Sequence, residues 1–468
     1  MTANAYAKIE ARQSETATLA EWAADVTLDM VPAKTLAHAR ACILDSIGCM
    51  IAGAESQPCR TLRAVFRQYG GIGDCVLPGS GQTLPLLKAV HHGAQAANAL
   101  DFDDSYRDGA PSHPGATVVP AALGMAEKLD AGGGQFLRAV IVGYETSLRI
   151  GRAIQPTPRR KADVYGFSTW QIFGAAFAAA SLLGLERGQL VQALGLAGVL
   201  APVPSLRKLG TDEAPPLPWI KNTYGAATEG GVLAALLAAD GYVGNRTILD
   251  GPRGFWLMAG SDRYDPAQLT RGLGEVWLLD NVGFKHYGCC RWTHTMLDAL
   301  AGIAARVDPV DVEKVEVFAF DELAGLGGGA PTSIVDAQFH APYLAALELL
   351  GRSPANGLRQ EDLHDPTVRD LTGRVVLRHD PALDAAFYGR GALPVRVRVH
   401  TASGALHDAS LEDPTGSSAA GGYPRDALLR KFMRLGSPRL GTERARRVPE
   451  VIESLERRAI TDLVRLIA

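Results

Sequence analysis

The feature that most constrains the fold is a run of very small residues inside an apolar helical pattern. Residues 174–180 contain only glycine, alanine and one phenylalanine, and the surrounding segment 171–183 repeats apolar side chains at helical spacing. Small side chains let neighbouring helices approach closely, which suits a helix buried on most of its surface. Helical spacing also appears at 19–26 and 35–51. We therefore predict a helical core in the first half of the chain.

The pattern changes after about residue 265. Segments 312–318 and 393–400 alternate β-branched with polar residues, which predicts strands. Segments 293–305 and 343–350 keep helical spacing. Strands and helices mixed in this way indicate an α+β region rather than more helical bundle.

The length of the chain and the return of the helical pattern predict two domains. A chain of 468 residues is longer than one ordinary core and long enough for two. Helical spacing returns near residue 424 and continues to the end. We predict a mainly α fold with an α+β insertion, in which residues 1–266 and 415–468 form a large helical domain and residues 267–414 form a smaller α+β lid.

Charge and composition exclude some classes of partner. The chain is 47% hydrophobic and 21% charged, as in an ordinary folded protein, and its formal net charge is -3. Binding to nucleic acid or an anionic membrane would therefore need a local basic patch. The most basic tract, residues 444–447, is followed by Glu450, Glu453 and Glu456, which indicates a solvated helix face. We expect neither partner.

The N-terminus and the cysteines indicate a location. The first residues lack the basic flank and apolar run of a secretion signal, and we expect no segment that spans a bilayer. Six cysteines are too few and too unevenly placed for a disulfide framework, and the adjacent Cys289 and Cys290 lack the spacing of a zinc pair. We expect a cytoplasmic protein with reduced thiols in its core or pocket wall.

A dense polar cluster interrupts the apolar first half. It contains Asp101, Asp103 and Asp104, and His113 follows shortly afterwards. Buried carboxylates are costly unless they are paired or protonated, so the cluster indicates a functional site. One alternative is a helix end where the aspartates cap or turn the chain and Asp101 faces solvent. Another is a magnesium site that adds Asp108, as in all-helical isoprenoid synthases, although a second acidic motif is missing.

Three basic residues are candidates for the chemistry. His113 precedes Pro114, which excludes helix at the histidine and favours a rigid loop from which an imidazole acts as acid or base. Lys221 lies where a proline-rich loop gives way to a helix of small residues, a position suited to binding a carboxylate. His294 follows Thr293, where another helix begins. Spacing alone does not bring the three together.

Several segments resemble, in order along the chain, those of the MmgE/PrpD family, whose members include 2-methylcitrate dehydratase, cis-aconitate decarboxylase and iminodisuccinate epimerase. The segments are LDSIGC (44–49), LDFDD (100–104), HPGA (113–116), GYE (143–145), YGF (165–167), Lys221, GPRGF (251–255) and KHYGCC (285–290), followed by Thr293 and His294. No single motif is decisive, but their joint order over nearly the whole chain is specific.

The resemblance implies a site between a helical domain and an α+β lid, in a homodimer, without metal or organic cofactor. By position, the residues implied to line it are Asp101, Ser105, His113, Lys221 and His294. Lys221 would then bind or polarise a carboxylate, while His113 or His294 would move the proton α to it. Arg291 and Lys285 are further candidates for holding a second carboxylate.

Two departures from the family pattern leave the reaction open. Relatives often have a histidine near the position of Ser168 and another where Tyr224 stands. Tyr165 or Tyr224 would then serve as a weak acid in their place. We expect a lyase that acts on a di- or tricarboxylate by removing the proton α to a carboxylate. The alternatives are an epimerase or racemase with the same site, and a non-catalytic helical scaffold.

Overall fold

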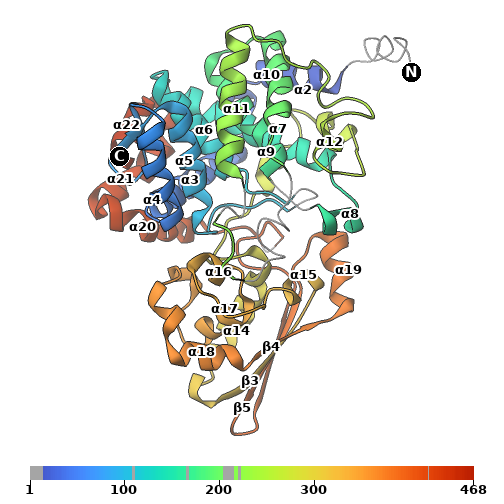
Figure 1. Cartoon of the computed structure of the whole chain (residues 1–468), viewed down its shortest axis with the longest axis vertical. Coiled ribbons are helices and arrows are strands. Elements are labelled where there is room, and N and C mark those ends of the chain that lie inside the picture. The colour runs from blue at the N-terminus through green and yellow to red at the C-terminus, as the bar shows by residue number, and fades with distance from the viewer. Residues whose placement is uncertain (1–13, 108–110, 165–167, 204–214, 220–222, 420) are drawn as a thin grey trace.

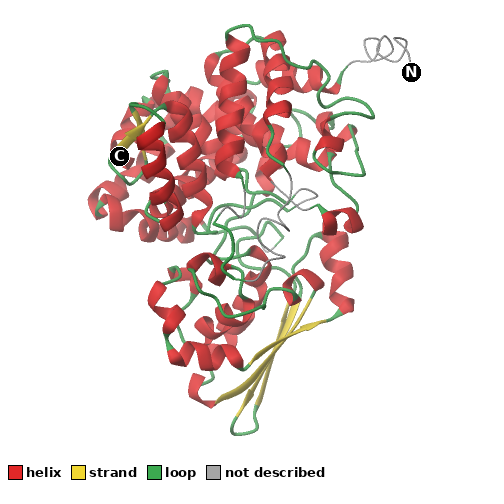
Figure 2. Cartoon of the chain, in the orientation of Figure 1, coloured by secondary structure: helices red, strands yellow, loops and turns green. Residues whose placement is uncertain are grey.

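The computed structural model describes residues 14–107, 111–164, 168–203, 215–219, 223–419 and 421–468. Figure 1 shows two regions, one built of packed helices and one that adds a sheet, and Figure 2 shows how strongly helix dominates. The predicted mainly α fold with an α+β portion is confirmed.

The helical region contains elements from both ends of the chain. Its elements are α2 (Glu15–Asp25), η1 (Leu28–Met30), α3 (Ala33–Gly53), α4 (Gln57–Tyr69), β1 (Cys75–Leu77), β2 (Gln82–Leu84), α5 (Leu86–Ala99), α6 (Gly115–Lys128), α7 (Gly133–Ala153), α8 (Pro158–Asp163), α9 (Ser168–Leu183), α10 (Arg187–Leu200), α11 (Tyr224–Ala239), α12 (Phe255–Met258), α13 (Ala267–Thr270), η3 (Leu278–Asn281), α20 (Arg425–Leu440), α21 (Thr442–Glu453), η8 (Leu455–Arg457) and α22 (Ile460–Ile467).

The small residues of α9 allow the close packing that their sequence predicted. A Cβ atom added at Gly174 would lie 2.9 Å from the carbonyl oxygen of Gly143 on α7 and 2.8 Å from the Cβ of Ser147. On the other side, a Cβ at Gly231 of α11 would lie 2.5 Å from the carbonyl oxygen of Ile172. Glycine therefore sets the distance between α9 and both neighbouring helices.

The C-terminal helices share one hydrophobic core with the N-terminal helices. Leu428 and Phe432 of α20 and Leu463 of α22 belong to the same buried cluster as Ile43 and Ile47 of α3. In Figure 1 these last helices lie in the helical region beside α3 to α5. The exact boundaries at residues 267 and 414 stay a prediction.

The α+β region has its own core around a four-stranded sheet. Its elements are η4 (Arg291–Thr293), α14 (His294–Ala304), η5 (Pro309–Asp311), β3 (Val312–Ala319), α15 (Asp321–Ala324), α16 (Ile334–Gln338), α17 (Ala341–Leu349), η6 (Pro354–Asn356), η7 (Gln360–His364), α18 (Pro366–Gly373), β4 (Val375–His379), α19 (Pro381–Arg390), β5 (Val395–Thr401) and β6 (Leu406–Leu411). The strand order is β4-β3-β5-β6, with β3 and β4 parallel and the other pairs antiparallel.

The pairing of β3 with β5 explains why their sequence patterns were readable. Val315 pairs with Val399 and Val317 with Val397, and all four side chains are buried in one cluster with residues of α14 and α17. Alternation along these strands thus separates a buried face from an open one. The strands β4 and β6 were not predicted, because β4 ends in exposed residues and the edge strand β6 is largely exposed.

One helix tests the expectation that no segment spans a bilayer. In the described part of the chain, α3 alone is long and apolar enough to cross a membrane by length and composition, and the expectation stays a prediction. Two thirds of its apolar window, 67%, is buried against other helices of the protein. This burial is typical of a core helix. The six cysteines are all free and buried, as expected.

The two regions meet at the segment that follows α5. Ser105 and Gly283 exchange backbone hydrogen bonds of 2.8 Å in both directions. The side-chain amide of Gln338, in α16, donates to the carbonyl oxygen of Ala99 at 3.0 Å. Residues 99–105 therefore lie between the helical core and the α+β core.

Candidate active site

The polar segment after α5 is buried rather than exposed. Asp101, Asp103 and Asp104 have relative exposures of 3%, 0% and 1%. The alternative in which Asp101 faces solvent is therefore wrong. Asp101 also has a left-handed backbone, with φ at 51°, a conformation that costs free energy for a residue other than glycine and concentrates at functional sites.

Asp101 forms a buried ion pair with Lys285. The Nζ atom of Lys285 lies 3.1 Å from Oδ2 of Asp101 and donates to the backbone oxygen of the same residue at 2.9 Å. The two side chains are 1% and 4% exposed. Removing both charges from water costs free energy, so such a pair contributes little to stability. It does place a buried charge beside the site, where it can interact with a ligand.

Asp103 fixes the imidazole of His113. Its carboxylate accepts two hydrogen bonds from the side-chain amide of Asn98, at 2.9 and 3.0 Å, and lies 3.3 Å from Nδ1 of His113. Burial favours the neutral carboxyl, but the attraction and hydrogen bond of His113 and the charge of Lys285 outweigh it and lower the pKa of Asp103. Asp103 is therefore ionised beside the imidazole.

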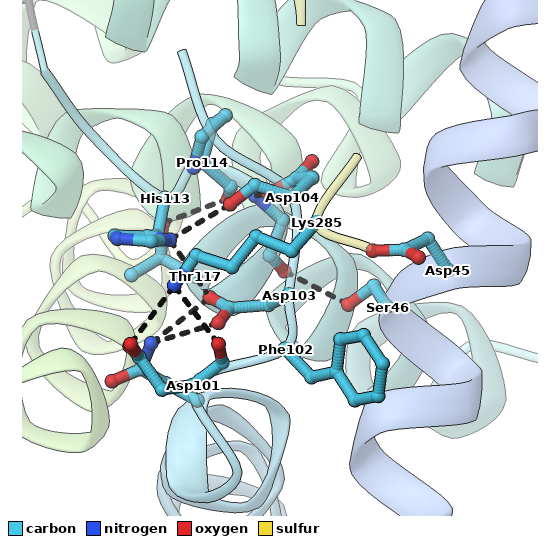
Figure 3. A network of polar contacts seen from close by, with 12 residues as sticks. Asp45, Ser46, Asp101, Phe102, Asp103, Asp104, His113, Pro114, Thr117 and Lys285 are labelled. Atoms are coloured by element: carbon cyan, nitrogen blue, oxygen red, sulfur yellow. Dashed lines mark hydrogen bonds and ion pairs between the residues drawn. The ribbon is translucent and has the colours of Figure 1, made fainter. Parts of the chain in front are cut away.

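His113 is oriented from both sides, as Figure 3 shows. Its Nδ1 lies 2.7 Å from the backbone oxygen of Asp104, and its backbone N–H donates to the side chain of Gln171 at 2.8 Å. Because Nδ1 faces a carbonyl and a carboxylate, which only accept, it must carry a proton. In the neutral ring the basic lone pair is then on Nε2, the tautomer that a general base needs.

Asp104 differs from Asp103 in its protonation. It accepts hydrogen bonds from the hydroxyl of Tyr144 at 2.6 Å and from the backbone N–H of Gly115 at 3.0 Å. Burial, together with the charges of Asp45 and Asp103, raises the pKa of Asp104 to about 8 despite these donors. Two neighbouring aspartates therefore hold different protonation states near neutral pH.

A second basic group lies on the α+β side of the site. His294 begins α14 fully buried, with Nε2 3.2 Å from the carbonyl oxygen of Cys289 and Nδ1 3.5 Å from a guanidinium nitrogen of Arg291. Burial and the positive charges of Arg291 and Lys285 hold the pKa of His294 well below its usual value. Both ring nitrogens of this neutral histidine are thus engaged within the protein.

Arg291 is the second buried cation. It donates to the carbonyl oxygen of Phe284 at 3.2 Å, while its buried Nε has no hydrogen-bond partner in the described part of the chain. Burial, and then the charge of Arg107, lower its pKa to about 10. A buried guanidinium without a bidentate carboxylate is suited to a ligand carboxylate.

Ser105 and Tyr224 also lie in the buried region. The hydroxyl of Ser105 is buried and has no hydrogen-bond partner among the residues described, while its backbone bridges to Gly283. Tyr224 begins α11, and its ring centroid lies 6.1 Å from that of His113. Lys221 and Tyr165 lie outside the described residues, as does the side chain of Ser168.

Sequence reasoning missed the groups that hold the aspartates from behind. Lys431 of α20 bonds at 2.6 Å both to Asp45 of α3 and to the backbone oxygen of Phe102. Tyr144, Asn98 and Gln171 were missed as well. The only signal in the sequence for Lys431 was a lysine within an apolar helical pattern, because its partner Asp45 is 386 positions away.

The described residues give no support to the magnesium alternative. They contain no group of three or more histidines, cysteines or acidic residues arranged to hold a metal ion. Asp103 and Asp104 are occupied by hydrogen-bond donors of the protein, and Asp108 lies outside the described residues. The donor set is that of an acid/base site.

Comparison with known proteins identifies the family. Residues 17–266 match the family model for the MmgE/PrpD N-terminal domain and residues 287–457 match that for the MmgE/PrpD C-terminal domain. The chain therefore belongs to the MmgE/PrpD family, and the resemblance seen in the sequence is confirmed.

Individual relatives match over most of their length. Cis-aconitate decarboxylase of Aspergillus terreus (strain NIH 2624 / FGSC A1156) is 26% identical over 98% of this chain and 96% of its own. The cis-aconitate decarboxylase-like protein oryM of Aspergillus oryzae is 26% identical over 97% of each chain. Human cis-aconitate decarboxylase is 26% identical over 74% of this chain and 73% of its own. The family and these relatives are enzymes.

Proposed function

We propose that this protein is a cofactor-independent lyase of the decarboxylase or dehydratase type, which acts on a di- or tricarboxylate through the carbon α to a carboxylate. The observation that carries the proposal is His113, oriented by the ionised Asp103 beside the buried pair of Asp101 and Lys285. The names of the relatives favour decarboxylation and a substrate of the cis-aconitate type.

His113 is the acid/base in this proposal. Its Nε2 removes the proton α to a substrate carboxylate, and Asp103 stabilises the imidazolium through Nδ1. The electron pair left on carbon spreads into the carboxylate as an enolate-like dianion. Lys285, Arg291 and the predicted Lys221 supply fixed positive charge for it, which is the larger part of such catalysis.

The two lyase outcomes differ in the bonds that break. In dehydration the carbanion expels the β-hydroxyl, which takes a proton and leaves as water. In decarboxylation no α-proton is removed: the carbon–carbon bond to a carboxylate breaks in place of a carbon–hydrogen bond, its electron pair stays on the substrate as CO2 leaves, and one proton from an acid neutralises the resulting carbanion. His113 supplies this proton from Nε2 while its Nδ1 stays bound to Asp103. In dehydration the proton is the one it removed from the substrate, and in decarboxylation His113 begins the step protonated and takes a new proton from solvent afterwards.

His294 has a positioning role in this proposal. Its two ring nitrogens are engaged by Arg291 and by the carbonyl of Cys289, and its pKa lies far below neutrality. A base in this state would have to break both contacts before it accepted a proton. The ring instead holds Arg291 in place.

An epimerase is the second candidate. It is favoured by Tyr224, a weak acid whose ring lies next to His113 where relatives often have a histidine. An epimerase needs one group on each face of a carbon and no acid for a leaving group. A silent scaffold is the third alternative.

A mass-spectrometric screen tests the proposal. The purified chain is incubated with a panel of di- and tricarboxylic acids, including cis-aconitate, citrate and 2-methylcitrate. We expect one acid to lose CO2 or water, and His113→Asn to slow the loss by roughly 100-fold or more. Matched His364→Gln, at an exposed histidine, should keep full rate. A change of configuration without change of mass would favour the epimerase, and no turnover of any acid would favour the scaffold.

Assembly and location are further proposals. We propose a homodimer, because the family resemblance implies one, and the cytoplasm stays the proposed location. Sedimentation of the full chain checks the assembly.

A further inference from the structure

A cavity lies between the two cores, on the side of the Phe102 segment away from His113. Its volume is about 240 Å3, and its wall includes Phe102. In Figure 3 the ring of Phe102 points toward α3, while Asp101 and Asp103 turn toward His113 and Lys285. The helical side of the cavity is α20, with Arg434 and Arg439, and the α+β side supplies Gln338 and Asn356. The cavity is thus separated from the candidate catalytic residues by the backbone of residues 100–102.

The cavity carries positive charge that the protein does not neutralise. In the part of the chain that the structure describes, neither Arg434 nor Arg439 forms an ion pair, and no aspartate or glutamate lines the cavity. The nearby Lys431 is already paired with Asp45. Arg434 lies three residues after Lys431 on α20, and Arg439 lies further along the same helix. Both arginines therefore face the cavity without a counter-charge.

Arg434 is held in place with part of its guanidinium unsatisfied. It donates to the side-chain oxygen of Asn356 at 3.3 Å, and its guanidinium carbon lies 5.8 Å from the centroid of the Phe102 ring. Its Nε is buried and has no hydrogen-bond partner among the described residues. A buried donor without a partner is costly, and an anionic oxygen is the partner that a guanidinium fork binds best.

We propose that this cavity is a second binding site, distinct from the catalytic one, for a small oxyanion such as a carboxylate or a phosphate. The cavity is smaller than the roughly 300 Å3 typical of the smallest pockets for drug-sized ligands, so the ligand is small. Arg434 and Arg439 bind the anionic group, and the amide of Asn356 binds a further oxygen. Such a ligand joins α20 of the helical core to the 356–358 segment of the α+β core, and it stabilises their closed arrangement around the Asp101 segment.

Isothermal titration of the full chain tests this site with two separate probes, inorganic phosphate and succinate. We expect at least one probe to bind the wild type, and Arg434→Gln and Arg439→Gln each to weaken its binding about tenfold or more. Arg446→Gln, at an exposed arginine of α21, is the matched control and should bind as the wild type does. Binding of only one probe identifies whether the site prefers a phosphate or a carboxylate.

The titration still tests the proposed site if one of the arginine variants fails to fold. Arg439 is exposed, so its replacement should leave the melting temperature unchanged, and Arg434→Lys keeps the charge if Arg434→Gln unfolds. A succinate molecule in the catalytic site would bind independently of Arg439. The proposal is overturned if neither probe binds at millimolar concentration, or if Arg439→Gln and the folded Arg434 variant bind both probes as tightly as the wild type.

Discussion

At the scale of single residues, the site works by giving similar side chains different states. Asp103 is ionised and Asp104 is neutral near pH 7, although they are adjacent and both buried. The difference comes from their neighbours, because Asp103 faces the imidazole of His113 whereas Asp104 faces the hydroxyl of Tyr144. His294 also differs from His113: both of its ring nitrogens are engaged within the protein, and burial, together with the charges of Arg291 and Lys285, holds its pKa well below the usual value.

The state of Asp104 predicts a pH dependence of stability. Its pKa is about 8 in the folded protein and near 3.8 in the unfolded chain, so folding favours its protonated form. The stabilisation is fully present below about pH 4 and is lost as the pH rises to about 8. Asp104→Asn cannot ionise, so urea unfolding should show its stability rising relative to wild type across that range. Exposed Asp370→Asn should show no such trend. A difference independent of pH would mean that Asp104 ionises normally.

At the scale of elements, α20 returns from the end of the chain to fix the catalytic segment. Its Lys431 binds Asp45 of α3 and the backbone oxygen of Phe102, next to the left-handed Asp101. One buried ammonium therefore ties two helices to the loop that carries the aspartates. The pair of Lys431 and Asp45 positions this loop more than it stabilises the fold, because both charges are removed from water.

Breaking this pair should be more harmful than removing it. Lys431→Met leaves Asp45 buried without its counter-charge and should lower the free energy of unfolding by about 3–5 kcal/mol. The double variant Asp45→Leu, Lys431→Met should recover much of that loss. Chemical denaturation measures both, with the exposed pair of Arg430 and Asp426 as the control. A double variant no more stable than Lys431→Met would show that the charge imbalance is not the cause.

The small residues of α9 make a separate prediction about helix packing. Gly174→Ala forces a Cβ against the backbone of Gly143 and should destabilise the protein by about 1–3 kcal/mol. Gly302 of α14 has nothing within 4 Å of its added Cβ, so Gly302→Ala should stabilise its helix by about 0.5–1 kcal/mol. Thermal unfolding of the two variants gives the sign of each change. A neutral Gly174→Ala would mean that α7 and α9 can separate at no cost.

At the scale of the whole molecule, two cores built from separate parts of the chain enclose one site. The helical core supplies Asp101, Asp103 and His113, and the segment that leads into the α+β core supplies Lys285, Arg291 and His294. The segment 99–105 is bonded to both sides, through Gly283 and Gln338. Movement of one core relative to the other would therefore change the distance between the acid/base and the cations.

The extent of sequence prediction follows from which interactions are local. The helix around residues 174–180 and the strands β3 and β5 were predictable, because their periodicity reflects a buried face within a few residues. The grouping of Asp101 with His113 was also visible as a polar island. The partners Lys431 and Tyr144 were not, since each contacts its aspartate across a long stretch of chain. The locked state of His294 likewise depends on burial that no local pattern reports.

The most direct test of the central claim is hydrogen exchange at the substrate carbon, followed by proton NMR of di- and tricarboxylates incubated with the protein in D2O. If His113 moves a proton at the carbon α to a carboxylate, the wild type should place deuterium on that carbon in the substrate or product. His113→Asn should then slow the incorporation by roughly 100-fold or more while His364→Gln leaves it unchanged. The claim is contradicted if an acid loses CO2 without deuterium entering the product, if an acid loses water while keeping the hydrogen α to its carboxylate, or if His113→Asn incorporates deuterium as fast as the wild type.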